Sequence, residues 1–153
     1  MSADFRYLGG EIPMVYLTRR ERFSAAHRLY NPGLSDQENE ELYGGCSNPN
    51  WHGHNYILWV TVRGEVNTDT GYLIDLKQLS RVMKERVIEK LDHRNINLEV
   101  DFMKDRYVST ENLAMAIWEQ LEAPVRELGA ELHCVKIQET ENNSVEYFGN
   151  NRV

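Results

Sequence analysis

The chain has 153 residues, enough for one domain with a sizeable core, and we expect a single domain over residues 1–153. The hydrophobic fraction of 41% and the charged fraction of 27% are ordinary for a soluble globular protein. The net charge of −7 argues against broad nucleic-acid binding, which depends on neutralising many phosphates. A local basic cluster can still bind a small anionic substrate.

Targeting and redox signals are weak in this sequence. No apolar run approaches the roughly 20 residues that span a bilayer, and residues 1–13 lack the features of a signal peptide. We therefore expect a cytoplasmic protein with no membrane partner, in which residues 1–13 form a loosely held lead-in. The only two cysteines, Cys46 and Cys134, do not suggest a disulfide framework, so each is treated as a free thiol.

The first half of the chain is predicted to form two strands. Residues 14–29 alternate well enough for a long strand in which Phe23, Ala25 and His27 share one face. Residues 31–50 are rich in turn formers and acids, which predicts a long loop of the kind that is often functional. Residues 54–64, dense in β-branched and aromatic side chains, give the clearest strand.

Two helices are expected next. The first follows from apolar residues at three- and four-residue steps: Leu76, Leu79, Met83, Val87 and Leu91. The second is predicted to begin at Ser109 or Thr110 as N-cap and to end at about Pro124. Glu111 falls in its first turn, where the helix dipole favours a carboxylate.

Two strands, over residues 131–139 and 144–149, are predicted to end the chain around a short turn. The order strand, strand, helix, helix, strand, strand indicates an α+β fold. We expect a four-stranded antiparallel sheet with both helices on one face.

Three histidines have the spacing of a metal site. His52 and His54 are two residues apart at the start of a strand, so their imidazoles point the same way. His27 ends the preceding strand, and a hairpin-like return would bring it beside them. Three imidazoles with an open fourth position are typical of catalytic zinc, although iron, nickel or copper also accept imidazole. The alternative is that these are ordinary polar residues at a strand edge.

Cys46 lies in a glycine-flanked loop six residues before His52. A cation nearby favours the thiolate, which makes such a cysteine a usable base or nucleophile. The alternative is a loop cysteine without a function. Cys134 lies within a predicted strand and is interpreted as inert packing.

Three further ionisable residues, Asp92, His93 and Glu139, can be interpreted either as functional groups or as ordinary structural ones. Asp92 and His93 are adjacent, which suits a general acid–base pair but equally a helix-end histidine favoured by the dipole. Glu139 shares its strand parity with Val135 and Ile137, so its carboxylate is predicted to face the apolar side. There it can pair with the amidine-like N–H edge of a guanine or pterin ring, or its side chain can escape to solvent.

Five segments together resemble the 6-pyruvoyltetrahydropterin synthase family, from about Leu17 to Gly149. They are FSAAHRL around His27, GGCSNPNWHGHNY around Cys46, LDHRNIN around Asp92, STENLAMAIW around Thr110 and KIQETENN around Glu139. Any one of them is a weak signal, but five in the right order at sensible spacing form a strong one.

The resemblance implies a role for each residue. Zinc would be bound by His27, His52 and His54, and Cys46 would accept the proton with Asp92 and His93 completing a relay. Glu139 would anchor the pterin ring, with Ser109, Thr110 and Glu111 close to it. A triphosphate site is not implied; Arg19, Arg20 and Arg22 are a candidate cluster or simply a solvated strand face.

The family converts 7,8-dihydroneopterin triphosphate to 6-pyruvoyltetrahydropterin, in tetrahydrobiopterin biosynthesis. The resemblance also implies the tunnelling fold, in which three subunits close their sheets into a barrel and two trimers stack into a homohexamer. Active sites then lie between subunits, so the groups that act with Cys46 would come from a neighbouring chain.

Three other functions stay open at this point. A related branch makes 6-carboxy-5,6,7,8-tetrahydropterin for queuosine synthesis, but it tends to have three residues between the cysteine and HGH, whereas five intervene here. A non-catalytic pterin- or metal-binding module would not need Cys46. A zinc hydrolase would need a carboxylate base beside the metal, and WHGHN offers none.

Overall fold

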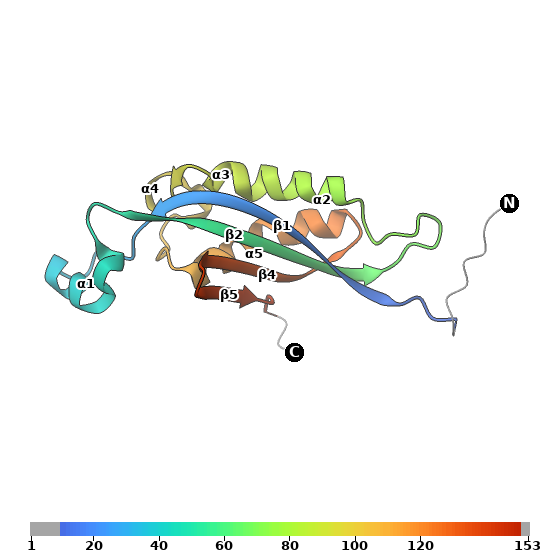
Figure 1. Ribbon diagram of the computed structural model, residues 1–153, viewed down its shortest axis with the longest axis horizontal. Coiled ribbons are helices and arrows are strands. Elements are labelled where there is room, and N and C mark those ends of the chain that lie inside the picture. The colour runs from blue at the N-terminus through green and yellow to red at the C-terminus, as the bar shows by residue number, and fades with distance from the viewer. Residues whose placement is uncertain (1–9, 151–153) are drawn as a thin grey trace.

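The computed structural model describes residues 10–150, folded as a long, curved sheet with helices packed against it (Figure 1). The sheet has the strand order β3-β1-β2-β4-β5. Its strands are β1 (Met14–His27), β2 (His52–Glu65), β3 (Arg94–Asn95), β4 (Glu131–Thr140) and β5 (Asn143–Tyr147). Residues 10–13 have no regular secondary structure, and the rest of the expected lead-in lies outside the described residues.

Strands β1 and β2 form an antiparallel pair over their whole length, from Met14 opposite Glu65 to His27 opposite His52. Side chains alternate between the two faces of a strand, and the buried apolar inward residues are Phe23 and Ala25 in β1 and the alternate residues from Tyr56 to Val62 in β2. The same alternation that buries Phe23 and Tyr56 therefore turns His27 and His54 to the inner face.

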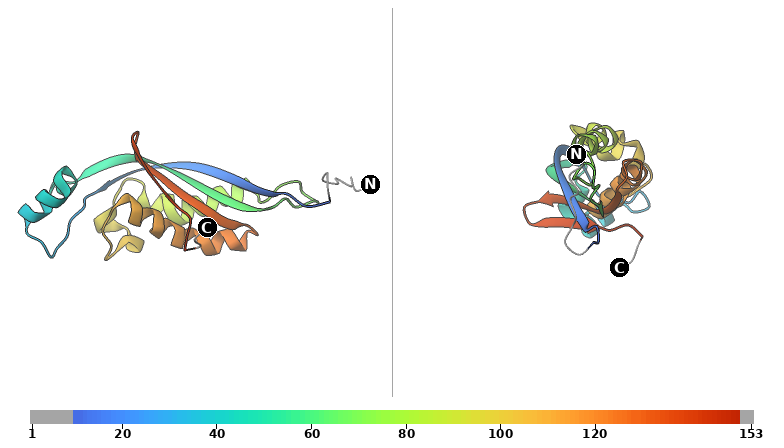
Figure 2. Two further views of the ribbon diagram at one scale, coloured as in Figure 1. Left: turned by 90° about the horizontal axis from the view of Figure 1, so that it is seen from below. Right: turned by 90° about the vertical axis from the view of Figure 1, so that its right-hand side faces the viewer.

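Two long helices cover the inner face of the sheet (Figures 1 and 2). The first consists of α2 (Leu76–Met83), a π-helical segment (Lys84–Ile88) and α3 (Glu89–Leu91), and the second is α5 (Thr110–Glu127). Buried side chains of both helices pack on those of β2 and β4 and form the core: Leu79, Met83, Leu113, Ile117, Leu121, Leu58, Val60, Val135 and Ile137. The predicted α+β class is confirmed.

The π-helical segment explains why the apolar residues of the first helix stay in line. Leu79, Met83, Val87 and Leu91 are each fully buried, although four-residue steps overrun the 3.6-residue turn of an α-helix. The wider turns between Lys84 and Ile88 absorb the difference. Leu76, which we expected on the same face, is 45% exposed because it lies in the first turn.

The prediction of four antiparallel strands is wrong in one respect. The sheet has a fifth strand, β3, which pairs in parallel with Ala25 and Ala26 of β1. Two residues are too few to show an alternating pattern. The strand is positioned by the preceding residues, because the Asp92 carboxylate and the His93 amide both bond to the backbone of Ser24.

The segment predicted as a long loop contains a helix, α1 (Asp36–Tyr43), and a 3₁₀ turn (Gly44–Ser47). Ser35 caps α1 with its side chain, and Glu38 bonds back to the Ser35 amide, which is a capping box. The buried Asn39 side chain donates hydrogen bonds to the carbonyls of Asn31, Leu34 and Ser35, which ties α1 to the segment before it. Figure 1 shows α1 at one end of the molecule, beyond the helices that cover the sheet.

Helix α5 ends at Glu127, three residues beyond the predicted stop at Pro124. Proline lacks an N–H and normally ends a helix, but here it lies in the last turn and disturbs little of the helix. Gly129, with a φ of +88°, reverses the chain after the helix. Two short helical segments, α4 (Ile96–Glu99) and a 3₁₀ turn (Asp101–Met103), link β3 to α5. Within residues 10–150, no helix has the length and apolar character needed to cross a membrane.

Candidate metal centre and surrounding pocket

The three predicted histidines meet at one end of the β1–β2 pair. His27 lies opposite His52 in the register, and their ring centroids are 4.5 Å apart. The His54 ring is 5.2 Å from that of His27 and 5.1 Å from that of His52. One ligand atom from each residue lies within 4.8 Å of the others, and the three can hold a metal ion.

The hydrogen bonding of His27 fits a metal ligand. Its side chain is almost fully buried, and its Nδ1 lies 2.8 Å from the backbone carbonyl oxygen of Val108. A carbonyl only accepts, so Nδ1 carries the proton and Nε2 keeps a lone pair. His27 Nε2 and His52 Nδ1 are buried without a hydrogen-bond partner. Zinc bonds imidazole nitrogen and would satisfy these atoms.

Electrostatics favour the neutral form that a metal needs. Burial lowers the pKa of the His52 imidazole, and the neighbouring His27 and His54 lower it further. Burial also lowers the pKa of His54, against an opposing effect of the Glu139 charge. Because their pKa values are lowered, His52 and His54 favour the neutral form that can bind a cation.

Glu139 reaches the histidines from β4. Its Oε1 lies 3.3 Å from His27 Nε2 and 3.6 Å from His54 Nε2. The contact with His27 does most to lower the pKa of the Glu139 carboxyl, and the Thr110 side chain also contributes. The inward parity that the sequence predicted for Glu139 is therefore what the structure has.

A cavity of about 460 Å³ connects the metal cluster with the predicted base and substrate residues. His27, Cys46 and Glu139 line it together with the N-terminus of α5. Ser109 is the N-cap of that helix, as predicted, and accepts a bond from the Asn112 amide. The remaining predicted substrate residues also line the cavity: Ser109, Thr110 and Glu111. Cys46 is exposed, and its carbonyl accepts the Leu29 amide.

Asp92 and His93 form the predicted pair, but away from Cys46. The Asp92 Oδ2 lies 2.9 Å from His93 Nδ1, and its Oδ1 accepts the Ser24 amide at 2.8 Å. The bond from the Ser24 amide does most to lower the pKa of Asp92. His93 is 82% exposed and lines a different cavity from Cys46. Within one chain the structure therefore does not bring this pair to the thiol.

The structure also bears on the arginine cluster and on Cys134. Arg22, the nearest member of the arginine cluster, is five residues before His27, on the order of 16 Å along a strand. Arg22 nevertheless lines a cavity of about 700 Å³ that His54 and Glu139 also line, whereas Arg19 and Arg20 do not line it. Cys134 is buried, and burial raises the pKa of its thiol, as expected for packing.

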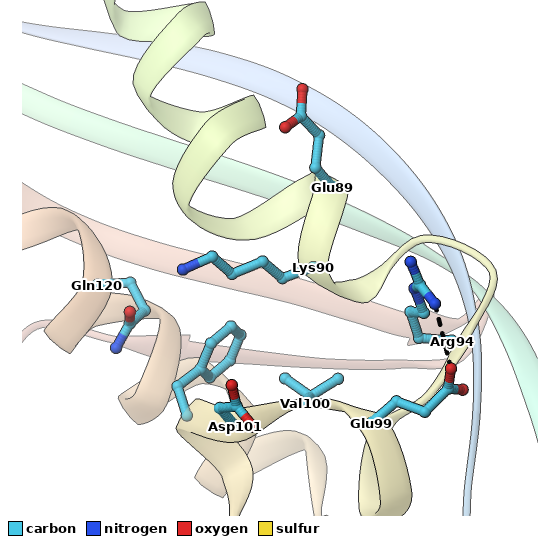
Figure 3. A pocket seen from close by; sticks show the side chains of 8 residues that line it. Glu89, Lys90, Arg94, Glu99, Val100, Asp101 and Gln120 are labelled. Atoms are coloured by element: carbon cyan, nitrogen blue, oxygen red, sulfur yellow. Dashed lines mark hydrogen bonds and ion pairs between the residues drawn. The ribbon is translucent and has the colours of Figure 1, made fainter.

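A larger cavity of about 760 Å³ lies outside this site, between α3 and α5 (Figure 3). Its lining carries charges of both signs, and Arg94 is paired with Glu99 at 3.2 Å. Lys90 extends across it toward Gln120. None of the three clustered histidines lines it, so the candidate site remains the cavity at the metal cluster.

The family model described as 6-pyruvoyl tetrahydropterin synthase matches residues 16–150. The chain belongs to this family. It is 45% identical over 141 residues to the human 6-pyruvoyl tetrahydrobiopterin synthase, covering 92% of this chain and 96% of the relative. It is 46% identical over 135 residues to the Dictyostelium discoideum protein of the same name, covering 88% and 96%.

The fold agrees with these relatives. The solved Caenorhabditis elegans 6-pyruvoyl tetrahydropterin synthase superposes with a TM-score of 0.85 at 40% identity, covering 91% of this chain and 98% of the other. The Bacillus subtilis 6-carboxy-5,6,7,8-tetrahydropterin synthase is more distant, at 33% identity over 100 residues and 63% of this chain. The family resemblance inferred from the motifs is confirmed.

The structure adds two groups that sequence reasoning missed. The Val108 carbonyl fixes the tautomer of His27, and backbone atoms leave no motif by which to find them. Tyr56 lies beside His54 on the inner face of β2. The sequence signal for Tyr56 was its position two residues after His54, which puts both side chains on the same face of the strand.

Proposed function

We propose that this protein is a zinc-dependent lyase that converts 7,8-dihydroneopterin triphosphate to 6-pyruvoyltetrahydropterin and releases triphosphate. The observation that carries the proposal is a cavity lined by Cys46, Glu139 and His27, the last of which is one of three convergent imidazoles. High identity to curated 6-pyruvoyl tetrahydrobiopterin synthases over most of the chain supports it. The physiological role would be tetrahydrobiopterin biosynthesis, with a cytoplasmic location as an expectation.

Zinc is the metal we assign to His27, His52 and His54. Three neutral imidazoles leave one coordination position open, which is the arrangement of catalytic rather than structural zinc. Bound there, zinc would act as a Lewis acid toward the oxygens of the substrate side chain. The lone pair of His27 Nε2 is directed by the Val108 carbonyl, so this ligand is held ready by the fold.

The remaining residues handle the proton and the ring. Cys46 as thiolate would remove a carbon-bound proton from the substrate side chain, after which triphosphate leaves as its carbon–oxygen bond breaks. Glu139 would accept two N–H bonds from the pterin ring, which is charge-assisted and fixes orientation. Ser109, Thr110 and Glu111 line the same pocket and would contact the substrate beside Glu139.

Asp92 and His93 would act on the Cys46 of another subunit. Their mutual bond sets up a proton relay, yet the cavities that Asp92 and His93 line are not the cavity that the Cys46 of their own chain lines. Assembly can bring the two halves together. We propose a homohexamer of two stacked trimers in which sheets join into a barrel.

Free sheet edges support this assembly. Within residues 10–150, β3 pairs only with Ala25 and Ala26, so β1 from Met14 to Phe23 has no partner strand along its outer edge. The outer edge of β5 is likewise unpaired in that part of the chain. Long unpaired edges attract further strands, and pairing between copies would satisfy both.

Two alternatives are less well supported. The 6-carboxy branch would use the same substrate, but the five residues from Ser47 to Trp51 between Cys46 and HGH, together with higher identity to the pyruvoyl enzymes, favour the latter. A non-catalytic pterin- or metal-binding module would not require a thiol in the pocket.

Product identification tests the proposal. The purified protein is incubated with 7,8-dihydroneopterin triphosphate under reducing conditions, and the products are identified by mass. The proposal predicts 6-pyruvoyltetrahydropterin with one equivalent of inorganic triphosphate. A 6-carboxytetrahydropterin product would move the protein to the other branch, and unchanged substrate would leave only a binding role.

A further inference from the structure

Three buried side-chain atoms lack a hydrogen-bond partner in the part of the chain that the structure describes: His27 Nε2, His52 Nδ1 and the Tyr56 hydroxyl. The first two are the atoms expected to bind metal. The third belongs to the same cluster, because the Tyr56 ring centroid lies 5.5 Å from that of His54 and 6.0 Å from that of His27. An orphaned hydroxyl at this place suggests that its partner arrives with the metal.

Tyr56 is held rigidly in this position. Its side chain is 1% exposed, and its ring stacks on Phe23 with centroids 4.8 Å apart. A buried hydroxyl without a partner costs about 1–3 kcal/mol, so a tyrosine where phenylalanine would pack equally well needs a reason. Because the oxygen itself is fully buried, a group inside the site is a better partner than a substrate arriving from solvent.

The Glu139 carboxylate is a suitable hydrogen-bond acceptor for the Tyr56 hydroxyl. Tyr56, His54 and Glu139 line one cavity of about 700 Å³. A tyrosine phenol is ordinarily protonated at neutral pH, so the hydroxyl can donate a hydrogen bond. In the present arrangement, however, the Glu139 Oε1 faces the nitrogens of His27 and His54.

A metal would change this arrangement. His27 Nε2 carries a lone pair, and a His54 nitrogen that binds a cation has no proton, so neither atom can donate to the carboxylate in the metal-bound site. We propose that Tyr56 is then the positioning residue of Glu139, and that its hydroxyl donates a hydrogen bond to the carboxylate. The bond keeps one Glu139 oxygen directed inward and orients the carboxylate toward the pterin ring. This role rests on the proposed function, in which Glu139 binds the ring.

The first test compares stability with and without metal and needs no turnover. Tyr56→Phe and wild type are melted as chelated protein and as zinc-loaded protein. Without metal the hydroxyl is unpaired, so the variant should melt at or above wild type; with zinc it should melt a few degrees below, because a partnered donor has been lost. Tyr16→Phe, at the exposed far end of β1, is the matched control and should show the same shift in both states. An equal shift for Tyr56→Phe in both states would overturn the proposal.

The second test measures recognition of the ring with 7,8-dihydroneopterin, which lacks the phosphates. Zinc-loaded Tyr56→Phe should bind it about tenfold more weakly than wild type, as expected for a lost bond to a charged group. In the Glu139→Gln background the same substitution should have little further effect, since the two residues act as a unit. Wild-type affinity in Tyr56→Phe would refute the positioning role alone. A wild-type protein that binds no pterin would refute the proposed function, and this inference with it.

Discussion

His27 Nδ1 lies 2.8 Å from the carbonyl oxygen of Val108, a residue 81 positions later in the chain. The bond leaves a lone pair on His27 Nε2 only when the loop before α5 is folded against β1. The metal centre is therefore built by tertiary structure as well as by the strand pair. Metal affinity and global stability should be coupled in this protein.

Removing one imidazole should abolish metal binding. His52 is half-buried at the start of β2, so His52→Ala should leave the core intact while the metal loses one of three ligands. We expect about one zinc per chain in wild type and almost none in the variant, measured by elemental analysis after dialysis. His133→Ala, on β4 and outside the cluster, should keep full occupancy. Full occupancy in His52→Ala would show that the metal lies elsewhere.

Replacing the proposed base should separate chemistry from binding. Cys46 is exposed in the pocket, so Cys46→Ala should retain zinc and pterin affinity and lose roughly 10²–10⁴-fold in turnover. Steady-state kinetics and binding titrations measure the two effects. Cys134→Ala is the matched control: it alters a buried packing thiol and should retain turnover. If Cys46→Ala turned over at the wild-type rate, another group would have to accept the proton.

Mixing inactive variants should reveal a site shared between subunits. Cys46→Ala and His93→Ala should each be inactive alone, because each lacks a group that the proposed proton transfer needs. Cys46 and His93 line different cavities of one chain, so a site that joins them would draw on two subunits. In mixed oligomers some sites would join an intact thiol to an intact Asp92–His93 pair. Random assembly from equal amounts should recover roughly a quarter of wild-type activity. Absence of recovery in verified mixed oligomers would place both groups in the same chain's site.

The residue before His52 is under backbone strain. Trp51 has a φ of 67°, in the left-handed region that favours glycine, and its ring packs 4.8 Å from the Arg28 guanidinium. Glycine should therefore be tolerated better than alanine at this position, by about 1 kcal/mol. We expect Trp51→Gly to melt above Trp51→Ala, with both retaining zinc. The reverse order would mean that strain at Trp51 is negligible.

The sequence was most informative where an alternating pattern ran long. Alternation predicted that Phe23, Ala25 and His27 share one face of β1, and the two-residue spacing predicted that the His52 and His54 rings point the same way. Glu139 was predictable for the same reason. Helix α5 was marked by its N-cap at Ser109.

Other features depend on contacts that no local pattern records. Helix α1 buries only Asn39, so it has almost no apolar face that a periodic pattern could reveal. The Ser35–Glu38 capping box was the one sequence signal for this helix. Strand β3 depends on bonds from Asp92 and His93 to Ser24, 68 residues away for the carboxylate. The separation of the Asp92–His93 pair from Cys46 is likewise a matter of three-dimensional arrangement.

The most direct test of the central claim is to remove the metal and repeat the product assay. The protein is stripped with a chelator, assayed with 7,8-dihydroneopterin triphosphate, and then titrated with zinc while product is followed by mass. We predict that formation of 6-pyruvoyltetrahydropterin disappears on stripping and returns in full at about one zinc per chain. The His52→Ala protein should not recover under the same titration. Turnover that persists in metal-free protein would contradict the account.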